Sequence, residues 1–254
     1  MMPGSTAVIA HRGSSAAEPE NTMRAFRAAD AAGADLIELD VRVSRDGVPV
    51  VVHDAGLGSG AGRASVSELS CEEISARRPE PRIPELEEVL CWARSRIETY
   101  LELKATGVAS SVVRLVSELE MQDQVLIGSF HPSEVARVRE LDSGLPTSVL
   151  SAHTDPGQVL RLGERLGANY VHLCWERAHP EPHRLLGQGL VEAARRSGMG
   201  VILWQEDRRR VLERLLEYEP DGICTNVPER LVAVREEYRK TRKATRSGGV
   251  APVA

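Results

Sequence analysis

Aromatic residues are scarce in this chain of 254 residues, because three Trp, four Tyr and two Phe make up only 4% of it. The core must therefore be built mainly from aliphatic side chains. The sequence also has no run near the roughly 20 apolar residues that a membrane-spanning helix needs. Residues 1–7 show no basic region leading into an apolar stretch, so we expect neither a signal peptide nor stable membrane insertion.

Cysteine is infrequent, and its four copies are scattered along the chain. The cysteines are Cys71, Cys91, Cys174 and Cys224. They form no Cys-x-x-Cys pair, which argues against a structural zinc site and against a disulfide framework. We expect four reduced thiols and a cytoplasmic protein.

Positive charge is not in excess. The chain holds 32 Lys and Arg against 37 Asp and Glu, for a net charge of -5, which argues against a general nucleic-acid-binding protein. Recognition of any phosphate group should therefore be local. The last residues, 239–254, are basic and have no apolar period, so we expect a disordered basic tail there.

Strand-like and helix-like segments alternate along the rest of the chain. Eight strands are predicted, at residues 8–10, 36–43, 99–103, 125–130, 147–150, 169–173, 201–204 and 222–225. Eight helices follow them, at residues 22–32, 85–94, 108–120, 132–141, 156–166, 185–197, 208–217 and 228–238. This alternation predicts an α/β fold, a (β/α)₈ TIM barrel.

The expected organisation is a single domain over residues 1–238, because barrels of about 250 residues commonly form one domain. A short insertion at about residues 55–82, after the hairpin of the second strand, should cap the barrel mouth as a mobile lid. A doubly wound open sheet is the alternative fold. It is disfavoured because Gly13-Ser14-Ser15-Ala16, after the first strand, is not a Gly-x-Gly-x-x-Gly phosphate loop.

Ionisable residues gather at the predicted carboxyl ends of strands, where barrels carry their functional groups. Three carboxylates suit a hard divalent cation, two histidines suit proton transfer near neutral pH, and two basic side chains suit an anionic substrate. In the same order, these residues are Glu38, Asp40 and Glu102, then His11 and His53, then Arg12 and Lys104. Gly13 would let the backbone approach a ligand closely.

The segment from residue 36 to residue 54 predicts part of its own geometry. Glu38 and Asp40 are two residues apart, so on a strand they share a face. Asp46-Gly47 is a strong hairpin signal, and folding the chain about it brings His53 roughly opposite Asp40. The competing interpretations are a solvent-facing strand edge for Glu38 and Asp40, and a plain surface ion pair for Glu102 and Lys104.

The candidate nucleophilic serines are Ser14, Ser15 and Ser129. None has an adjacent residue that could act as its base, so the sequence does not indicate a serine hydrolase. The remaining histidines are His131, His153, His172, His179 and His183. Their spacing is not that of metal ligands, so they are interpreted as residues that do not bind the metal. This interpretation is least secure for His172.

With these residues in view, the chain resembles the glycerophosphodiester phosphodiesterase family, whose fold is a (β/α)₈ barrel. The resemblance runs from about residue 8 to residue 228. The matching fragments, in order, are His11-Arg12-Gly13, Pro19-Glu20-Asn21-Thr22, Glu38-Leu39-Asp40-Val41, Asp46-Gly47, His53-Asp54, Ile83-Pro84-Glu85-Leu86-Glu87-Glu88, Glu102-Leu103-Lys104, Ser129-Phe130 and Asp221-Gly222-Ile223.

The resemblance implies a phosphoric diester hydrolase that converts glycerophosphodiesters, as small-molecule substrates, to sn-glycerol 3-phosphate and an alcohol. It implies one divalent cation, Mg²⁺ or Ca²⁺, on Glu38, Asp40 and Glu102. His11 and His53 would be the acid-base pair, and Arg12 and Lys104 would hold the phosphodiester oxygens. The alcohol, the choice of cation, the division of acid and base roles and the formation of a homo-oligomer stay open.

The sequence departs from the family pattern at two later motifs. The usual Trp-Thr-Val-Asn is here Trp204-Gln205-Glu206-Asp207, and the usual Thr-Asp before proline is Thr225-Asn226-Val227-Pro228. These changes leave the expected metal site intact. Two rival functions are kept: a lysophospholipase D-like or cyclising phosphodiesterase, and a barrel that binds phosphorylated ligands without catalysis.

Overall fold

The chain folds as a closed barrel of eight parallel strands surrounded by helices, in a computed structural model that describes residues 6–175, 179–181, 183–186 and 189–247. The barrel strands, in chain order, are β1 (Ala7–Ala10), β2 (Leu36–Val43), β6 (Glu98–Leu103), β7 (Val125–Ser129), β8 (Thr147–Ser151), β9 (Tyr170–Cys174), β10 (Gly200–Trp204) and β11 (Gly222–Thr225). β1 pairs with both β11 and β2, which closes the barrel and confirms the predicted fold.

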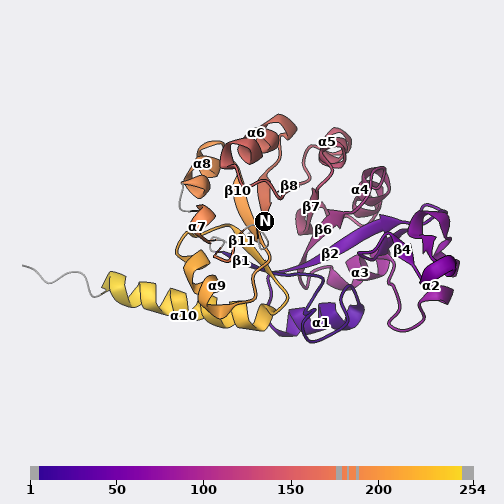
Figure 1. Cartoon of the computed structure of the whole chain (residues 1–254), viewed down its shortest axis with the longest axis horizontal. Helices are drawn as coiled ribbons and strands as arrows, with labels where there is room; N and C mark the ends of the chain where they lie inside the picture. The colour runs from indigo at the N-terminus through magenta and orange to yellow at the C-terminus, as the bar shows by residue number, and fades with distance from the viewer. Residues whose placement is uncertain (1–5, 176–178, 182, 187–188, 248–254) are drawn as a thin grey trace, which may run out of the picture.

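The helices lie outside the strands, as Figure 1 shows. They are α1 (Met23–Ala31), α3 (Leu86–Ala93), α4 (Ala109–Glu118), α5 (Pro132–Leu141), α6 (Pro156–Leu166), α7 (His183–Leu186), α8 (Leu190–Arg196), α9 (Arg209–Leu216) and α10 (Pro228–Ser247). The helix expected at residues 185–197 is represented by α7 and α8, with residues 187 and 188 outside the described part.

The core has the two layers that a barrel requires. Inward side chains near the amino ends of the strands, among them Ile9, Leu36 and Tyr100, form one buried cluster in the lumen. Two larger aliphatic clusters lie between the strands and the helices. Because neighbouring residues on a strand face opposite sides, each strand contributes to both layers.

A hairpin extends the second strand, as predicted. β3 (Pro49–Val51) runs antiparallel to β2, with Val41 opposite Val51, and the Val52 backbone N–H donates to the Asp40 carbonyl oxygen at 2.9 Å. Gly47 has a φ of 84°, which suits glycine in the tight turn. Asp40 is thus opposite Val52, and His53 follows by one residue.

The segment after the hairpin forms short elements at the end of β2 (Figure 1): β4 (Gly56–Leu57), η1 (Gly60–Gly62), β5 (Ala64–Ser65), η2 (Val66–Glu68) and α2 (Cys71–Arg77). The segment has its own buried cluster, in which Val66, Leu69 and Ile74 pack with Val50 and Val52. The expectation of a mobile lid rests on the sparse apolar content of this segment. These few apolar residues are nevertheless gathered on one side and buried.

The carboxyl-terminal helix is longer than the sequence predicts. α10 continues to Ser247, so residues 239–247 are helical where a disordered tail was expected, and residues 248–254 lie outside the described part. Polar contacts extend along this helix, since Arg239 pairs with Glu236 and the Arg242 guanidinium lies 5.6 Å from the Tyr238 ring centre. Among the described helices, none is long and apolar enough to cross a membrane.

Candidate functional site

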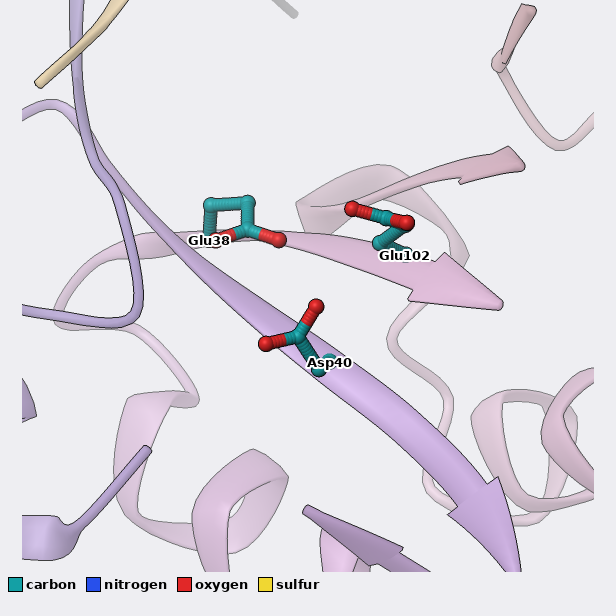
Figure 2. Close-up of side chains that lie close together, drawn as sticks. All are labelled: Glu38, Asp40 and Glu102. Carbon is teal, nitrogen blue, oxygen red and sulfur yellow. The ribbon is translucent and has the colours of Figure 1, made fainter. Parts of the chain in front are cut away.

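Three carboxylates converge at the carboxyl ends of two neighbouring strands. Glu38 and Asp40 project from β2 and Glu102 from β6, and Figure 2 shows the three groups facing a common point. Asp40 is directly opposite Glu102 in the parallel register. One ligand oxygen from each residue lies within 4.8 Å of the others, a spacing that could hold a metal ion.

The two-residue period of the strands places these groups inside the barrel. Leu36, on the same face of β2, belongs to the lumen cluster, whereas Leu39 packs in the outer layer. The exposed fractions are 2% for Glu38, 0% for Asp40 and 4% for Glu102. A solvent-facing strand edge is therefore excluded for Glu38 and Asp40.

Two basic residues lie against the carboxylates. Lys104 Nζ is 2.7 Å from Glu102 Oε1 and 3.4 Å from Asp40 Oδ1. Arg12 Nε is 3.0 Å from Asp40 Oδ2, and the Arg12 backbone N–H donates to Glu38 Oε2 at 2.9 Å. The Lys104 side chain is only 12% exposed, so its pair with Glu102 is not a plain surface ion pair.

The electrostatics of the cluster fit a bound cation. Burial and the charge of Asp40 raise the pKa values of both Glu38 and Glu102. Burial also disfavours the charged form of Asp40, but Arg12 and Lys104 hold its pKa below the usual range. Glu38 Oε1 is buried and finds no hydrogen-bond partner in the described part of the chain. A divalent cation would let all three carboxylates ionise together and would give that oxygen a partner.

His11 follows β1 and has one ring nitrogen occupied. Its Nδ1 is 2.7 Å from Asn226 Oδ1, while Nε2 is buried without a hydrogen-bond partner among the described residues. The Trp204 ring lies edge-on to His11, with 5.3 Å between ring centres. Burial, assisted by the positive charge of Arg12, lowers the pKa of His11 to about 4. The neutral imidazole is thus favoured.

His53 is placed differently, on the loop after β3 and half-exposed. Its Nδ1 is 3.0 Å from Asp54 Oδ1, so the adjacent carboxylate orients the ring. A pocket beside it is lined by Glu20 and Asn21 from the barrel and by Arg78 and Arg82 from the inserted segment. The inserted segment therefore forms one wall beside His53.

Gly13 is required for packing of the backbone against helix α1. Its φ is 83°, and a Cβ atom there would lie 2.6 Å from the backbone carbon of Ala25 on α1. A side chain at this position would therefore clash with α1, so the backbone conformation and the close packing both require glycine.

Sequence reasoning assigned no role to several polar residues that the fold brings to the site. Asn21 donates from Nδ2 to Asp40 Oδ2 at 2.7 Å, and Asp207 accepts from Asn226 Nδ2 at the same distance. Arg42 donates from Nε and Nη2 to the His53 carbonyl oxygen at 2.9 and 2.8 Å. Asn21 and Asn226 lie in sequence fragments that are compared with the family pattern. That comparison is the one feature of the sequence that could have pointed to a role for them.

His172, the histidine that the sequence excludes least securely as a metal ligand, lies inside the barrel. Its Nδ1 is 2.8 Å from the Tyr100 hydroxyl, and its ring centre is 6.3 Å from that of Trp204. Burial, together with the charge of His11, lowers its pKa to about 3. It is not part of the carboxylate cluster.

Comparison with known proteins agrees with this geometry. Residues 11–230 match the glycerophosphoryl diester phosphodiesterase family. A glycerophosphodiester phosphodiesterase of Caldanaerobacter subterraneus subsp. tengcongensis is 30% identical over 89% of this chain and 96% of its own length. A probable glycerophosphodiester phosphodiesterase 2 of Mycobacterium tuberculosis is 31% identical over 88% of each chain.

Solved structures share the fold over nearly their whole length. The crystal structure of a glycerophosphodiester phosphodiesterase from Agrobacterium tumefaciens is 27% identical, with a TM-score of 0.76, over 90% of this chain and 99% of that one. A phosphodiesterase of Oleispira antarctica, solved with the product sn-glycerol-3-phosphate, is 22% identical with a TM-score of 0.76, over 91% of this chain and 97% of that one. The chain belongs to the glycerophosphoryl diester phosphodiesterase family, a family of phosphoric diester hydrolases.

Proposed function

We propose that this protein is a metal-dependent glycerophosphodiester phosphodiesterase, which hydrolyses glycerophosphodiesters to sn-glycerol 3-phosphate and an alcohol. One observation carries the proposal: three buried carboxylates within 4.8 Å of one another lie at the barrel mouth, beside two cationic side chains. Family membership supports the substrate class.

Glu38, Asp40 and Glu102 would hold one divalent cation, Mg²⁺ or Ca²⁺. The donor set consists of oxygen atoms only, which suits hard cations. When bound, the cation would polarise a phosphoryl oxygen and neutralise part of the charge that develops there. The free Oε1 of Glu38 and the raised pKa values of Glu38 and Glu102, caused by burial and neighbouring charge, support this assignment.

Arg12 and Lys104 would hold the phosphodiester oxygens. Both cationic groups touch Asp40 and both have partly exposed side chains at the same mouth, at 13% and 12%. The carboxylates raise the pKa of Lys104 despite its burial, so the ammonium group stays charged when an anion arrives. A fixed guanidinium and an ammonium group suit a singly charged phosphodiester.

His11 and His53 would act as the acid-base pair. His11 has a buried Nε2 without a hydrogen-bond partner among the described residues, and His53 is oriented by Asp54 at a more exposed position. One ring would remove a proton from the nucleophile, which is either water or the glycerol hydroxyl group, and the other would protonate the leaving alkoxide oxygen. Attack by water gives sn-glycerol 3-phosphate directly, whereas attack by the hydroxyl group gives a cyclic phosphate that water must then open.

Residues 55–82 would cap the mouth of a single barrel domain. Arg78 and Arg82 line the pocket that contains His53, so this segment is placed to contact the alcohol part of the substrate. We also propose a cytoplasmic location, which all four cysteines support because none is paired in a disulfide.

Turnover of glycerophosphocholine tests the function, with Mg²⁺, Ca²⁺, Mn²⁺ or a chelator present. His11→Ala and Glu38→Gln should each lower kcat/KM by at least about 100-fold, because they remove a proton-transfer group and a metal ligand. Glu140→Gln on the outer helix α5 is the control, since Glu140 pairs with Arg137 at the surface. Phosphorus NMR of the products would identify a cyclic phosphate if the substrate's own hydroxyl attacks.

Wild-type turnover in the His11→Ala and Glu38→Gln variants would contradict the assigned site. Metal binding without hydrolysis across a panel of glycerophosphodiesters would contradict the enzymatic function altogether.

A further inference from the structure

The Nδ1 side of His11 is fixed by a chain of hydrogen bonds that reaches to the next loop of the barrel. Asn226, which follows β11, has its Oδ1 at 2.7 Å from His11 Nδ1 and at 2.8 Å from the Ser15 hydroxyl. Its Nδ2 donates to Asp207 Oδ2 at 2.7 Å. A carboxylate oxygen can only accept, so the amide group of Asn226 must present its nitrogen to Asp207 and its oxygen to His11.

Asp207 is itself held in place by the last residue of β11 and the residue after it. Its Oδ1 accepts from the Asn226 backbone N–H at 2.8 Å and from the Thr225 hydroxyl at 2.9 Å. Side chain and backbone of Asn226 thus bind the two oxygens of one carboxylate. This arrangement fixes the plane of the Asn226 amide group and prevents it from turning over.

An amide oxygen at 2.7 Å requires a proton on His11 Nδ1. Nε2 is then the nitrogen with a free lone pair, and it is the buried nitrogen without a partner among the described residues. The Trp204 ring, 5.3 Å away, restricts rotation of the imidazole from one side.

We propose that Asn226 and Asp207 are positioning residues, which hold His11 as the Nδ1-protonated tautomer so that Nε2 is the atom that exchanges a proton with the substrate. The inference rests on the proposed acid-base role of His11. A neutral amide in contact with Nδ1 orients the ring without adding a negative charge that would favour the imidazolium form.

The first test is the tautomer in the unmodified protein. Long-range ¹H–¹⁵N NMR of the ¹⁵N-labelled full chain with Mg²⁺ separates protonated from unprotonated ring nitrogens, and a His11→Asn variant assigns the His11 signals. We expect Nδ1 protonated and Nε2 unprotonated at neutral pH. The opposite tautomer would overturn the inference, even if the enzyme is active.

The second test uses Asn226→Ala, Asp207→Asn and the exchange variant Asp207→Asn/Asn226→Asp, with glycerophosphocholine as substrate. Each single change should lower kcat by at least about 10-fold at nearly constant KM, because tautomer control is part of acid-base catalysis. The exchange restores an amide–carboxylate pair and should recover part of the loss. Asn169→Ala, at the opposite end of the barrel, is the control.

Retention of both wild-type kcat and the Nδ1-protonated tautomer in Asn226→Ala would overturn the inference. Wild-type turnover in His11→Ala would instead overturn the proposed function, so the two failures are distinguishable.

Discussion

Asp40 is the most completely buried member of the carboxylate cluster, and Asn21 holds it in addition to Arg12 and Lys104. Asn21 donates to Asp40 Oδ2 at 2.7 Å and accepts from the Asp40 backbone N–H at 3.2 Å. Asn21 has a φ of 57°, in the left-handed region where asparagine is tolerated. A side chain that orients a metal ligand contributes to metal affinity almost as a ligand does.

We predict that Asn21→Gly weakens Mg²⁺ binding by about 10- to 100-fold, because Asp40 loses the donor that orients it. Glycine accepts the left-handed φ, so the backbone is not strained. Isothermal titration with Mg²⁺ measures the change, and Asn169→Gly is the control. Equal affinity in Asn21→Gly and wild type would show that Asp40 is oriented without Asn21.

Both residues of the Asp207–Asn226 contact depart from the usual family pattern. Asp207 stands where Asn is usual, and Asn226 stands where Asp is usual. The two side chains are hydrogen-bonded to each other. Relative to the family pattern, the amide and the carboxylate have exchanged positions, so the pair still consists of one amide and one carboxylate. The departures that looked independent in the sequence are thus a single change in the structure.

A second residue-scale prediction concerns His172 and acid stability. Burial, with the charge of His11, lowers the pKa of His172 to about 3. Above about pH 6.5 the ring is neutral in both folded and unfolded chains, and its contribution to stability is complete. As pH falls below 6.5 the unfolded chain takes up a proton that the folded chain excludes, so stability falls by up to about 1.4 kcal/mol per pH unit.

His172→Gln should therefore show a smaller loss of unfolding free energy between pH 7 and pH 5 than wild type. Urea unfolding at each pH measures this, with His131→Gln as the control for a partly exposed ring. His11 contributes in the same direction, because burial and Arg12 lower its pKa to about 4, so part of the slope should remain. An unchanged slope in His172→Gln would contradict the prediction.

At the scale of elements, the β2–β3 hairpin organises most of the site. β2 supplies Glu38 and Asp40, and the returning arm supplies His53. Arg42, also on β2, donates two hydrogen bonds to the His53 carbonyl oxygen and one, at 3.4 Å, to that of Lys104. One side chain thus ties together the loops that carry a proposed acid-base residue and a proposed phosphate-binding residue.

We predict that Arg42→Met lowers kcat/KM for glycerophosphocholine by about 10-fold or more, since small displacements of positioned groups reduce turnover strongly. Mg²⁺ affinity should change much less, because Arg42 donates these hydrogen bonds to backbone carbonyl oxygens and not to the carboxylate groups of the cluster. Steady-state kinetics and titration separate the two effects. Arg45→Met in the same hairpin is the control, and an equal loss in both variants would point to general damage of the hairpin.

At the scale of the whole molecule, the last helix secures the first strand. Arg235 on α10 donates to the Thr6 carbonyl oxygen at 3.1 Å and pairs with Asp35, whose carboxylate accepts from the Val8 backbone N–H at 2.7 Å. The Arg235 side chain is only 8% exposed. These contacts join residues about 200 positions apart, where β1 closes the barrel.

Arg235→Met should lower the free energy of unfolding by about 3 kcal/mol, because it leaves the Asp35 carboxylate without its partner in a largely buried place. Urea denaturation measures the change. Lys240→Met, at an exposed position of the same helix, should change stability by less than about 0.5 kcal/mol. A neutral result for Arg235→Met would mean that strand pairing alone secures β1.

Metal binding should also stabilise the whole fold, because the proposed cation would be held by three carboxylates that are buried only in the folded chain. Mg²⁺ at 100 times its dissociation constant should add about 2.7 kcal/mol, and a chelator should remove it. Thermal melts with and without Mg²⁺ measure the shift. The Glu38→Gln variant should show a much smaller shift, and an equal shift in both would place the stabilising ion elsewhere.

Local pattern in the sequence determined the alternation of strands and helices, the hairpin at Asp46-Gly47, and the shared face of Glu38 and Asp40. These features depend on residues a few positions apart, so periodicity and turn chemistry suffice. The same local rules missed α2 and the length of α10, because α2 is short and the end of α10 is polar, so neither shows a clear apolar period.

The tertiary structure decided which partners the site residues have. Closure of the barrel brings Asn226 to His11 across 215 positions of sequence and Asn21 to Asp40 across 19. No local pattern encodes such contacts, since they depend on where separate strands end at one mouth. The sequence thus determined which chemical groups are present, whereas burial and long-range hydrogen bonding decided their charge and orientation.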